Sequence, residues 1–170
     1  MAYKIRPATA SDVPLLPAIE QSASDLFKDT EFAAEVGQDC LSVEFHAEQL
    51  AAGRLWIAAD VDDVPVGFAV AIIIDGLPHL HELSVDPAHG QKGIGRRLVE
   101  TVCDWAAQSG YSSITLSTYS GIPWNAPWYE RCGFRAIDAT ELGPGLIRLR
   151  DDESSSGLDI AKRVIMIREL

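Results

Sequence analysis

Cysteine is scarce in this sequence, with three residues among 170, and the three are far apart. Cys40, Cys103 and Cys132 form no CxxC pair, so their spacing predicts neither a zinc site nor a disulfide framework. We therefore expect a protein without a bound metal, whose chemistry depends on other side chains.

The sequence also has no long apolar run and few basic residues. The longest apolar run, residues 66–74, is too short to span a bilayer, and the first residues do not have the pattern of a signal peptide. Lys and Arg number 14 against 25 Asp and Glu, a net charge of −11, which argues against binding to nucleic acid or anionic membranes. We expect a cytoplasmic protein whose acidic surface suits a cationic small molecule.

Hydrophobic spacing predicts one α/β domain over residues 1–170, with no internal repeat and no linker. Strand-like segments cover residues 3–6, 55–59, 64–74, 79–85, 113–118, 134–139 and 163–169, and helices are expected near residues 11–26, 42–52, 94–109, 125–132 and 144–156. Turns at Asp62-Asp63 and Asp75-Gly76 favour an antiparallel meander, within which Gly67 indicates a bulge. The helical crossover before residues 113–118 makes that strand parallel to its predecessor. The predicted fold class is therefore α/β (α+β), a mixed and mostly antiparallel central sheet of six to seven strands flanked by helices.

The segment LSVDPAHGQKGIGRRL, residues 83–98, joins a strand to a helix through a glycine turn. Asp86-Pro87 ends the strand because proline has no N–H to donate, and helical spacing begins at Ile94. The first amides of such a helix have no intrahelical partner and carry the positive end of the macrodipole. Gly93 and Gly95 would let an anion approach the main chain closely, so the turn predicts an anion site. On the glycines alone, an ordinary loop before a core helix is an equally good interpretation.

Three basic residues add positive charge to this turn: Lys92, Arg96 and Arg97. The turn has no Gly-Lys-Ser/Thr ending, which excludes a Walker A loop. Leu98 stands where a Rossmann fingerprint has its third glycine, and the strands before the turn look antiparallel. The anion is therefore expected to belong to a different nucleotide-like ligand.

A second motif, PWNAPWYERCGF, occupies residues 123–134 between two predicted strands. Asn125 is a suitable N-cap, Pro127 is tolerated in the first turn, and Gly133 ends the helix after about two turns. Tyr129 lies one helical turn after Asn125. By itself, an aromatic residue here indicates a core position more often than a catalytic one.

The two motifs, on either side of the strand SITLST (113–118), resemble those of the GNAT superfamily of N-acetyltransferases. The resemblance is specific over residues 80–134 and extends through most of the chain in the order of elements. It implies a sheet splayed between its fourth and fifth strands, with the pantetheine arm of acetyl-CoA in the gap. It also implies that main-chain groups of Leu83 and Val85 bind the pantetheine.

By the same resemblance, the glycine turn holds the diphosphate of acetyl-CoA through the main-chain N–H groups of Gln91, Lys92, Gly93, Ile94, Gly95 and Arg96. Asn125 and Tyr129 would lie near the thioester. One departure concerns Gly90 and Gln91, because the family usually has Arg or Gln at the first of these positions and often Gly at the second. Since the phosphate contacts are mainly made by the main chain, we expect binding to survive with a modest loss or a shifted loop.

Acyl transfer to an amine requires a base, a stabilised carbonyl oxygen and a proton for the leaving thiolate. The resemblance and the acidity of a phenol assign Tyr129 as the acid that protonates the thiolate. Strand alternation puts Glu82 and Ser84 on one face, and we expect Glu82 to be the base, directly or through water. The alternatives are a structural salt bridge for Glu82 and a histidine base, either His79 or His81.

These observations predict an acetyl-CoA-dependent N-acetyltransferase that moves the acetyl group directly to a primary amine of a small molecule or peptide. Direct transfer is favoured because neither motif places a cysteine where a nucleophile would be needed. The alternative is an acyl-CoA-binding regulatory module with weak catalysis, and a longer acyl chain or an oxygen acceptor would also fit the fold. The acceptor pocket has no recognisable motif, and residues 144–170 could contribute to a homodimer.

Overall fold

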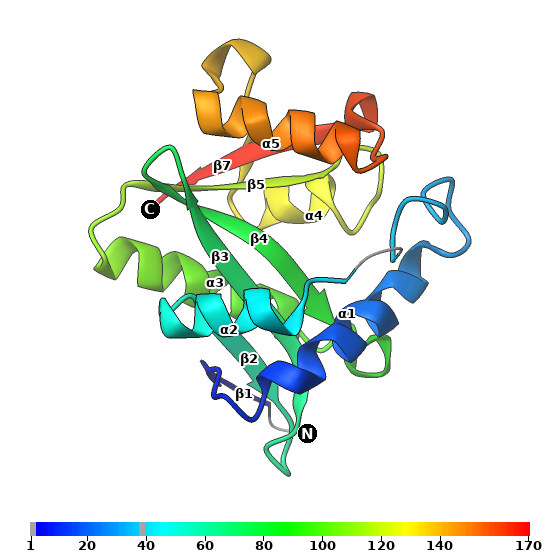
Figure 1. Cartoon of the computed structure of the whole chain (residues 1–170), viewed down its shortest axis with the longest axis vertical. Coiled ribbons are helices and arrows are strands. Elements are labelled where there is room, and N and C mark those ends of the chain that lie inside the picture. The colour runs from blue at the N-terminus through cyan, green and yellow to red at the C-terminus, as the bar shows by residue number, and fades with distance from the viewer. Residues whose placement is uncertain (1–2, 38–39) are drawn as a thin grey trace. The chain divides into compact units, whose positions relative to one another are not determined.

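The computed structural model describes residues 3–37 and 40–170 of the chain (Figure 1). Seven strands form one sheet in the order β1-β2-β3-β4-β5-β7-β6. The strands are β1 (Lys4–Pro7), β2 (Leu55–Ala59), β3 (Pro65–Ile74), β4 (Leu77–Val85), β5 (Ser113–Tyr119), β6 (Arg135–Ala136) and β7 (Arg163–Glu169). The helices are α1 (Leu16–Ser24), α2 (Val43–Ala51), α3 (Ile94–Gln108), α4 (Ala126–Arg131) and α5 (Pro144–Ser155). Within the described ranges, no helix has the length and apolar character needed to cross a membrane.

Most neighbouring strands of the sheet are antiparallel. β1 pairs with β2, β2 with β3, and β7 with both β5 and β6 in this direction. β4 and β5 are parallel, with His79 opposite Thr115 and Leu80 opposite Leu116. The parallel direction follows because helix α3 returns the chain before β5 begins. The predicted fold class is confirmed, whereas the splay between β4 and β5 stays a prediction.

The chain divides into two compact units. Unit 1 comprises Met1–Ala71 and Glu82–Val102, and unit 2 comprises Ile72–His81 and Cys103–Leu170. The elements β3, β4 and α3 each contribute residues to both units. Each unit has its own set of buried apolar side chains.

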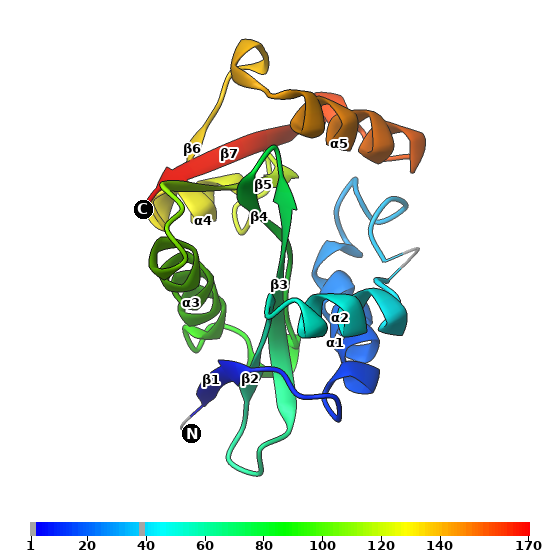
Figure 2. The same cartoon turned by 60° about the vertical axis from the view of Figure 1, so that its left-hand side comes forward.

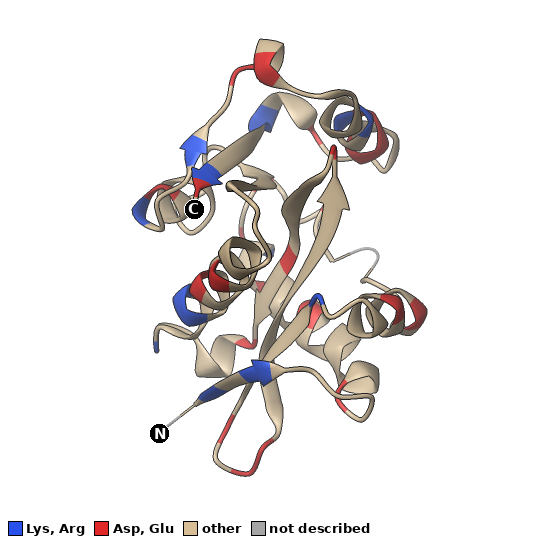
Figure 3. Cartoon of the chain, turned by 90° about the vertical axis from the view of Figure 1, so that its left-hand side faces the viewer, with Lys and Arg blue, Asp and Glu red and all other residues tan. Residues whose placement is uncertain are grey.

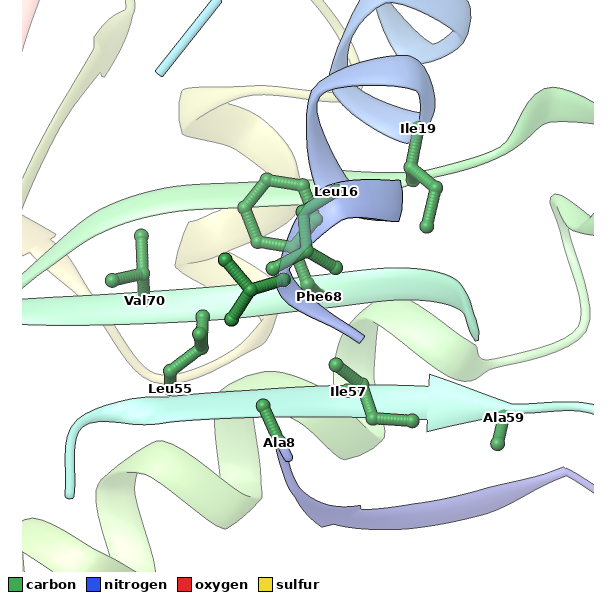
Figure 4. Close-up of a cluster of buried hydrophobic side chains, with 9 residues drawn as sticks. Ala8, Leu16, Ile19, Leu55, Ile57, Ala59, Phe68 and Val70 are labelled. Atoms are coloured by element: carbon green, nitrogen blue, oxygen red, sulfur yellow. The ribbon is translucent and has the colours of Figure 1, made fainter. Parts of the chain in front are cut away.

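In unit 1, helices cover both faces of the sheet. Helices α1 and α2 lie on one face of β2 and β3, and the first turns of α3 lie on the other (Figure 2). The cluster on the α1 and α2 side consists of Ala8, Val13, Leu16, Ile19, Leu55, Ile57, Ala59, Phe68 and Val70 (Figure 4). Leu55, Ile57 and Ala59 reach the same face because side chains alternate along a strand. This cluster fixes α1 against β2 and β3.

Unit 2 is built on the antiparallel pair of β5 and β7, in register from Ser113 opposite Glu169 to Tyr119 opposite Arg163. Its fully buried side chains include Ile114, Ile165 and Met166. This pairing stabilises unit 2, because apolar side chains of both strands are buried along it.

Helix α5 is fastened to the turn between β3 and β4 by Asp75. The carboxylate of Asp75 accepts hydrogen bonds from the main-chain amides of Gly145 at 2.8 Å and Leu146 at 3.2 Å. These bonds satisfy donors that the first turn of a helix leaves open. The helix ends before Gly157, which has a φ of 91°, as the sequence predicts.

One local expectation differs from the structure, and another agrees with it. The strand predicted over residues 134–139 covers only Arg135–Ala136, because Asp138 and Glu141 form a capping box that starts a 3-10 turn, η4 (Ala139–Glu141). The bulge predicted at Gly67 agrees with the register of β2 and β3, because Ala58 pairs with Gly67 and Ala59 with Pro65, which leaves Val66 of β3 as the extra residue. Gly67 also allows a close approach, since a Cβ there would lie 2.9 Å from the main-chain oxygen of Ser84.

A nearly buried ion pair joins β1 to the start of the first helical region. Arg6 Nη1 lies 2.7 Å from Asp12 Oδ2, and the side chain of Asp12 is 5% exposed. The amide of Thr9 donates to the same carboxylate at 2.7 Å. Burial raises the pKa of Asp12, but the hydrogen bonds from Arg6 and Thr9 outweigh burial and leave this pKa below its ordinary value.

We predict that Asp12→Asn lowers the free energy of unfolding by about 2–4 kcal/mol, because it leaves Arg6 without its buried partner. A carboxylate whose pKa is lowered by folding stabilises the protein above its unfolded pKa, and the wild type should lose this contribution as the pH falls through the folded value. Urea unfolding at neutral and acidic pH measures both effects.

The matched control is Asp63→Asn, because Asp63 also bonds to Arg6 at 3.0 Å but its side chain is 67% exposed. The expected change for this variant is below about 0.5 kcal/mol. Equal losses from the two substitutions would contradict the assigned role of burial.

Candidate functional site

The glycine turn (residues 86–96) lies in unit 1, between the end of β4 and the start of α3. Asp86 follows β4 and caps a 3-10 turn, η3 (Pro87–His89), by accepting a hydrogen bond from the Ala88 amide at 2.8 Å. Helix α3 then begins at Ile94. The predicted succession of strand, glycine turn and helix is confirmed.

The start of α3 leaves main-chain amides open to a ligand. The first i→i−4 hydrogen bond runs from Arg97 N to Gly93 O at 3.2 Å, so the amides of residues 94–96 precede it. Gly93 is exposed, and apart from its two chain neighbours no described residue lies within 4 Å of the position that a Cβ would take there. Basic residues colour this end of α3 blue (Figure 3). The arrangement can hold an anion against the main chain.

Two of the three basic residues in and next to the turn (Lys92, Arg96 and Arg97) are held by other groups of unit 1. Lys92 Nζ donates to the main-chain oxygen of Ala88 and to Tyr3 Oη, both at 3.2 Å. Arg97 Nη1 donates to the main-chain oxygen of Tyr3 at 2.9 Å. Arg96 is exposed at the start of the helix. The hydrogen bonds of Lys92 and Arg97 therefore stabilise the conformation of the turn.

Glu82 and Ser84 lie on the same face of β4, as strand alternation predicts. Ser84 is buried, and its hydroxyl donates to Glu82 Oε1 at 2.8 Å. Leu83 and Val85 are half-buried and alternate with them along the strand. The hydroxyl of Ser84 thus fixes the orientation of the Glu82 carboxylate.

Glu20 on α1 is a carboxylate that the sequence reading did not single out. Burial and the negative charge of Glu82 raise the pKa of Glu20 to about 7, and a hydrogen bond from the Leu41 amide opposes the rise. That amide donates to Glu20 Oε2 at 3.0 Å. Its position one helical turn after buried Leu16 was a signal that Glu20 faces inward.

In unit 2, α4 carries Asn125 and Tyr129 one helical turn apart. Asn125 occupies the N-cap position, but its side chain does not cap the helix. It donates instead from Nδ2 to the hydroxyl of buried Thr118 at 2.8 Å, which ties α4 to β5. The Tyr129 ring is half-buried and meets Trp128 and Phe134 edge to face, at centroid distances of 4.9 and 5.8 Å.

His79 and His81, the rival bases, lie in the part of β4 that belongs to unit 2. His79 is 2% exposed, and its Nδ1 lies 2.8 Å from the hydroxyl of Thr115. Burial, with the charges of His81 and Arg163, lowers the pKa of His79 to about 3. Burial also lowers the pKa of His81, although the carboxylate of Glu153 opposes the change. Both imidazoles are therefore weak bases in this structure.

A second group missed by the sequence reading is the ion pair of Arg163 on β7 with Glu153 on α5. Arg163 Nη2 lies 2.9 Å from Glu153 Oε1 and donates to Ser117 Oγ at 3.2 Å. Its guanidinium also stacks on the ring of Tyr119, 4.7 Å from the centroid. No local pattern in the sequence identifies this pair, because β7 and α5 meet only through the fold.

The structure thus brings the predicted residues together in two groups. Unit 1 contains Glu82, Leu83, Val85 and the six residues 91–96, and unit 2 contains Asn125 and Tyr129. Over residues 3–37 and 40–170, no three His, Cys, Asp or Glu side chains are grouped so that they could hold a metal ion.

A model of the acetyltransferase (GNAT) family matches residues 18–134 of the chain. S-(2-succino)cysteine N-acetyltransferase of Bacillus subtilis is 32% identical over 74 residues, which are 42% of this chain and 45% of that protein. The chain therefore spans less than half the length of this curated relative.

Two solved structures share the fold. N-acetylglutamate synthase from Neisseria gonorrhoeae, complexed with coenzyme A and N-acetyl-glutamate, matches with a TM-score of 0.73 and 20% identity over 100% of this chain and 35% of its own. The PaiA N-acetyltransferase from Thermoplasma acidophilum, in complex with coenzyme A, matches with a TM-score of 0.72 and 16% identity over 100% of both chains. At these identities the likeness shows a common fold.

The pair Gly90 and Gln91 has a visible conformational cost. Gln91 has a φ of 57°, in the left-handed region that glycine adopts without strain, and Gly93 has a φ of 75°. Gly90 has an ordinary extended conformation, with φ −62° and ψ 166°. The left-handed φ that favours glycine is therefore occupied by glutamine. Gly90 has an ordinary φ, although a Cβ there would lie 3.1 Å from the main-chain oxygen of Pro87.

We predict that Gln91→Gly raises the free energy of unfolding by about 0.5–1 kcal/mol, because it removes the strain of a side chain at positive φ. Gly93→Ala is the converse change and should lower the free energy of unfolding by about 1 kcal/mol. Thermal unfolding of both variants measures the effect, and a lower melting temperature for Gln91→Gly would contradict it.

Proposed function

The chain belongs to the acetyltransferase (GNAT) family, and on that premise we propose that it transfers an acetyl group from acetyl-CoA directly to a primary amine of a small molecule or peptide. The observation that carries this proposal is the glycine turn, where Gly93 is exposed and the first amides of α3 precede the first i→i−4 hydrogen bond, an arrangement that suits an anion. Coenzyme A is present in both structural relatives described above, which supports acetyl-CoA as the cosubstrate.

The residues present fit acetyl-CoA. We assign the main-chain N–H groups of residues 91–96 to its diphosphate, because they lie at the positive end of α3. Main-chain groups of Leu83 and Val85, at the end of β4, would bind the pantetheine arm. Asn125 would lie near the thioester, held in place by its hydrogen bond to Thr118.

Two side chains are proposed to move protons. Roughly one molecule in a thousand of an ordinary alkyl amine is neutral at pH 7, so the acceptor needs a base, and we assign this role to Glu82. The hydroxyl of Ser84 orients its carboxylate. The phenol of Tyr129 is assigned to protonate the thiolate of coenzyme A as it leaves. The lowered pKa of His79, about 3, supports Glu82 over this histidine.

The charges of the protein and of acetyl-CoA support the proposed acceptor and the proposed cellular location. A net charge of −11 attracts amines, which are cations before they lose a proton. The relative from Bacillus subtilis is named for an amino acid derivative, S-(2-succino)cysteine, which supports a small polar acceptor. Acetyl-CoA carries several negative charges and does not cross a bilayer unaided, so we propose that the protein acts in the cytoplasm.

We predict that the protein releases coenzyme A thiol from acetyl-CoA when a panel of small amines and peptides is added. Tyr129→Phe and Glu82→Gln should each lower kcat by about 10²–10⁴-fold, because each removes a proton-transfer group. Tyr111→Phe is the matched control and should leave the rate unchanged, since Tyr111 packs on Trp105 at the end of α3.

Rates measured across about pH 5–9 separate the two roles. If both variants keep the wild-type profile, the assignments are wrong. Binding of coenzyme A without thiol release, over the whole panel, would favour the regulatory module instead of the enzyme.

We predict that Glu20→Gln leaves the acid limb of the kcat/KM profile in place and abolishes the change in rate that the ionisation of Glu20 causes near its pKa of about 7. Glu20 is protonated on the acid limb, so the substitution removes no charge there. Above that pKa the substitution removes a negative charge beside Glu82, while the amide oxygen of glutamine can still accept from Leu41. The control is Glu48→Gln, an exposed residue of α2, which should shift nothing.

Stability gives an independent check of the raised pKa. A carboxyl group with a raised folded pKa stabilises the fold while protonated, and this contribution is lost as the pH rises through about 7. Above that pH, Glu20→Gln should therefore melt at a higher temperature than the wild type. A profile and a melting curve that match those of the wild type would rule out the proposed coupling to Glu82.

A further inference from the structure

Tyr3, which precedes β1, contacts the glycine turn although it is 86 residues from His89 in the sequence. The side chain is 8% exposed. Its hydroxyl lies 3.0 Å from His89 Nδ1 and accepts a hydrogen bond from Lys92 Nζ at 3.2 Å. A single hydroxyl therefore joins the end of η3 to the residue that precedes Gly93.

Further contacts keep residue 3 and the turn together. The rings of Tyr3 and His89 meet edge to face at 5.7 Å, and the ammonium of Lys92 lies 5.7 Å from the centre of the tyrosine ring. The main-chain oxygen of Tyr3 accepts from Arg97 in the first turn of α3. Tyr3, just before β1, thus contacts both the turn and the helix that follows it.

The direction of each hydrogen bond follows from the donors present. Lys92 can only donate, so Tyr3 Oη accepts from it. A buried hydroxyl proton needs an acceptor, which directs it to His89 Nδ1. The arrangement therefore requires a hydroxyl at residue 3 and a hydrogen-bond acceptor at residue 89.

Ordering the segment between His89 and Lys92 costs conformational free energy. It contains Gln91 in the left-handed region, with Gly93 directly after Lys92 in the same region. Such conformations are sparsely populated by a free loop, above all at a residue with a side chain. A loop that is already held in its binding conformation binds its ligand without paying for its ordering.

We propose that Tyr3 is a positioning residue for the cosubstrate. Its hydroxyl fixes His89 and Lys92, so that the amides of residues 91–96 stay directed at the diphosphate of acetyl-CoA. Tyr3 acts through the turn and takes no part in the chemistry. This inference rests on the proposed function.

The first test is Tyr3→Phe, which removes the hydroxyl and keeps the ring and the main-chain oxygen. The Kd for coenzyme A and the KM for acetyl-CoA should rise about three- to tenfold, with kcat unchanged within about twofold. Calorimetry and steady-state kinetics measure these quantities. Tyr111→Phe removes a hydroxyl from a tyrosine that packs on Trp105 and serves as the matched control.

A pair of substitutions at the partner tests the assigned proton. His89→Ala should raise the Kd for coenzyme A by a similar factor, because the phenol loses its acceptor. His89→Asn should restore most of the affinity, since a carboxamide oxygen can accept the same proton. A purely structural role would not distinguish these two replacements.

The outcomes separate this inference from the proposed function. An unchanged or lower Kd for Tyr3→Phe, in a protein whose wild type binds coenzyme A, overturns the role of Tyr3 and leaves the proposed function intact. A changed melting temperature with an unchanged Kd has the same meaning. A wild type that does not bind coenzyme A overturns both, and binding without thiol release overturns only the proposed transfer.

Discussion

The burial of one face of α3 is the constraint on which the candidate site depends. Ile94, Leu98 and Val99 are 2%, 0% and 0% exposed, so the apolar face of the helix fixes both its direction and its first residue. The amides before Arg97 cannot be paired within the helix, and they lie where the chain has just left β4. The hydrophobic effect therefore sets the position of a polar site, because the open end of the helix follows from its buried face.

Packing in unit 1 determines the orientation of one carboxylate and the pKa of another. Glu82 is oriented by Ser84, and Glu20 is brought near it by α1, whose apolar residues pack in the core cluster. Burial first, and then the negative charge of Glu82, raise the pKa of Glu20 to about 7. In unit 2 the same burial has the opposite consequence for imidazole, since it disfavours the protonated forms of His79 and His81.

Tyr3, just before β1, combines a buried side chain with hydrogen bonds to the candidate site. Tyr3 is buried like a core residue, yet its hydroxyl and its main-chain oxygen satisfy groups of the glycine turn and of α3. The turn contains strained backbone at Gln91, and strained segments persist where the surrounding structure determines them. A residue far away in the sequence thus offsets a local cost at the anion site.

Much of the fold could be predicted from local patterns. The helical spacing from Ile94, the stop at Gly133 and the parallel direction of β5 depend on residues that are near each other in the chain. The roles of Tyr129 and Glu82 stay predictions, because the side-chain chemistry depends on a ligand and on an acceptor that no local pattern specifies. The strand predicted over residues 134–139 is longer than β6, because the capping box of Asp138 and Glu141 starts a 3-10 turn.

The sequence by itself determined the order of the elements, the glycine turn and the family resemblance, because periodicity, turn residues and motif spacing are properties of neighbouring residues. The tertiary structure decided that Glu20 lies beside Glu82, that Asn125 bonds to Thr118 instead of capping its helix, and that Tyr3 holds the turn. These pairs are set by packing between separate elements, and the energies that choose them are those of burial and of hydrogen bonds formed in the folded protein.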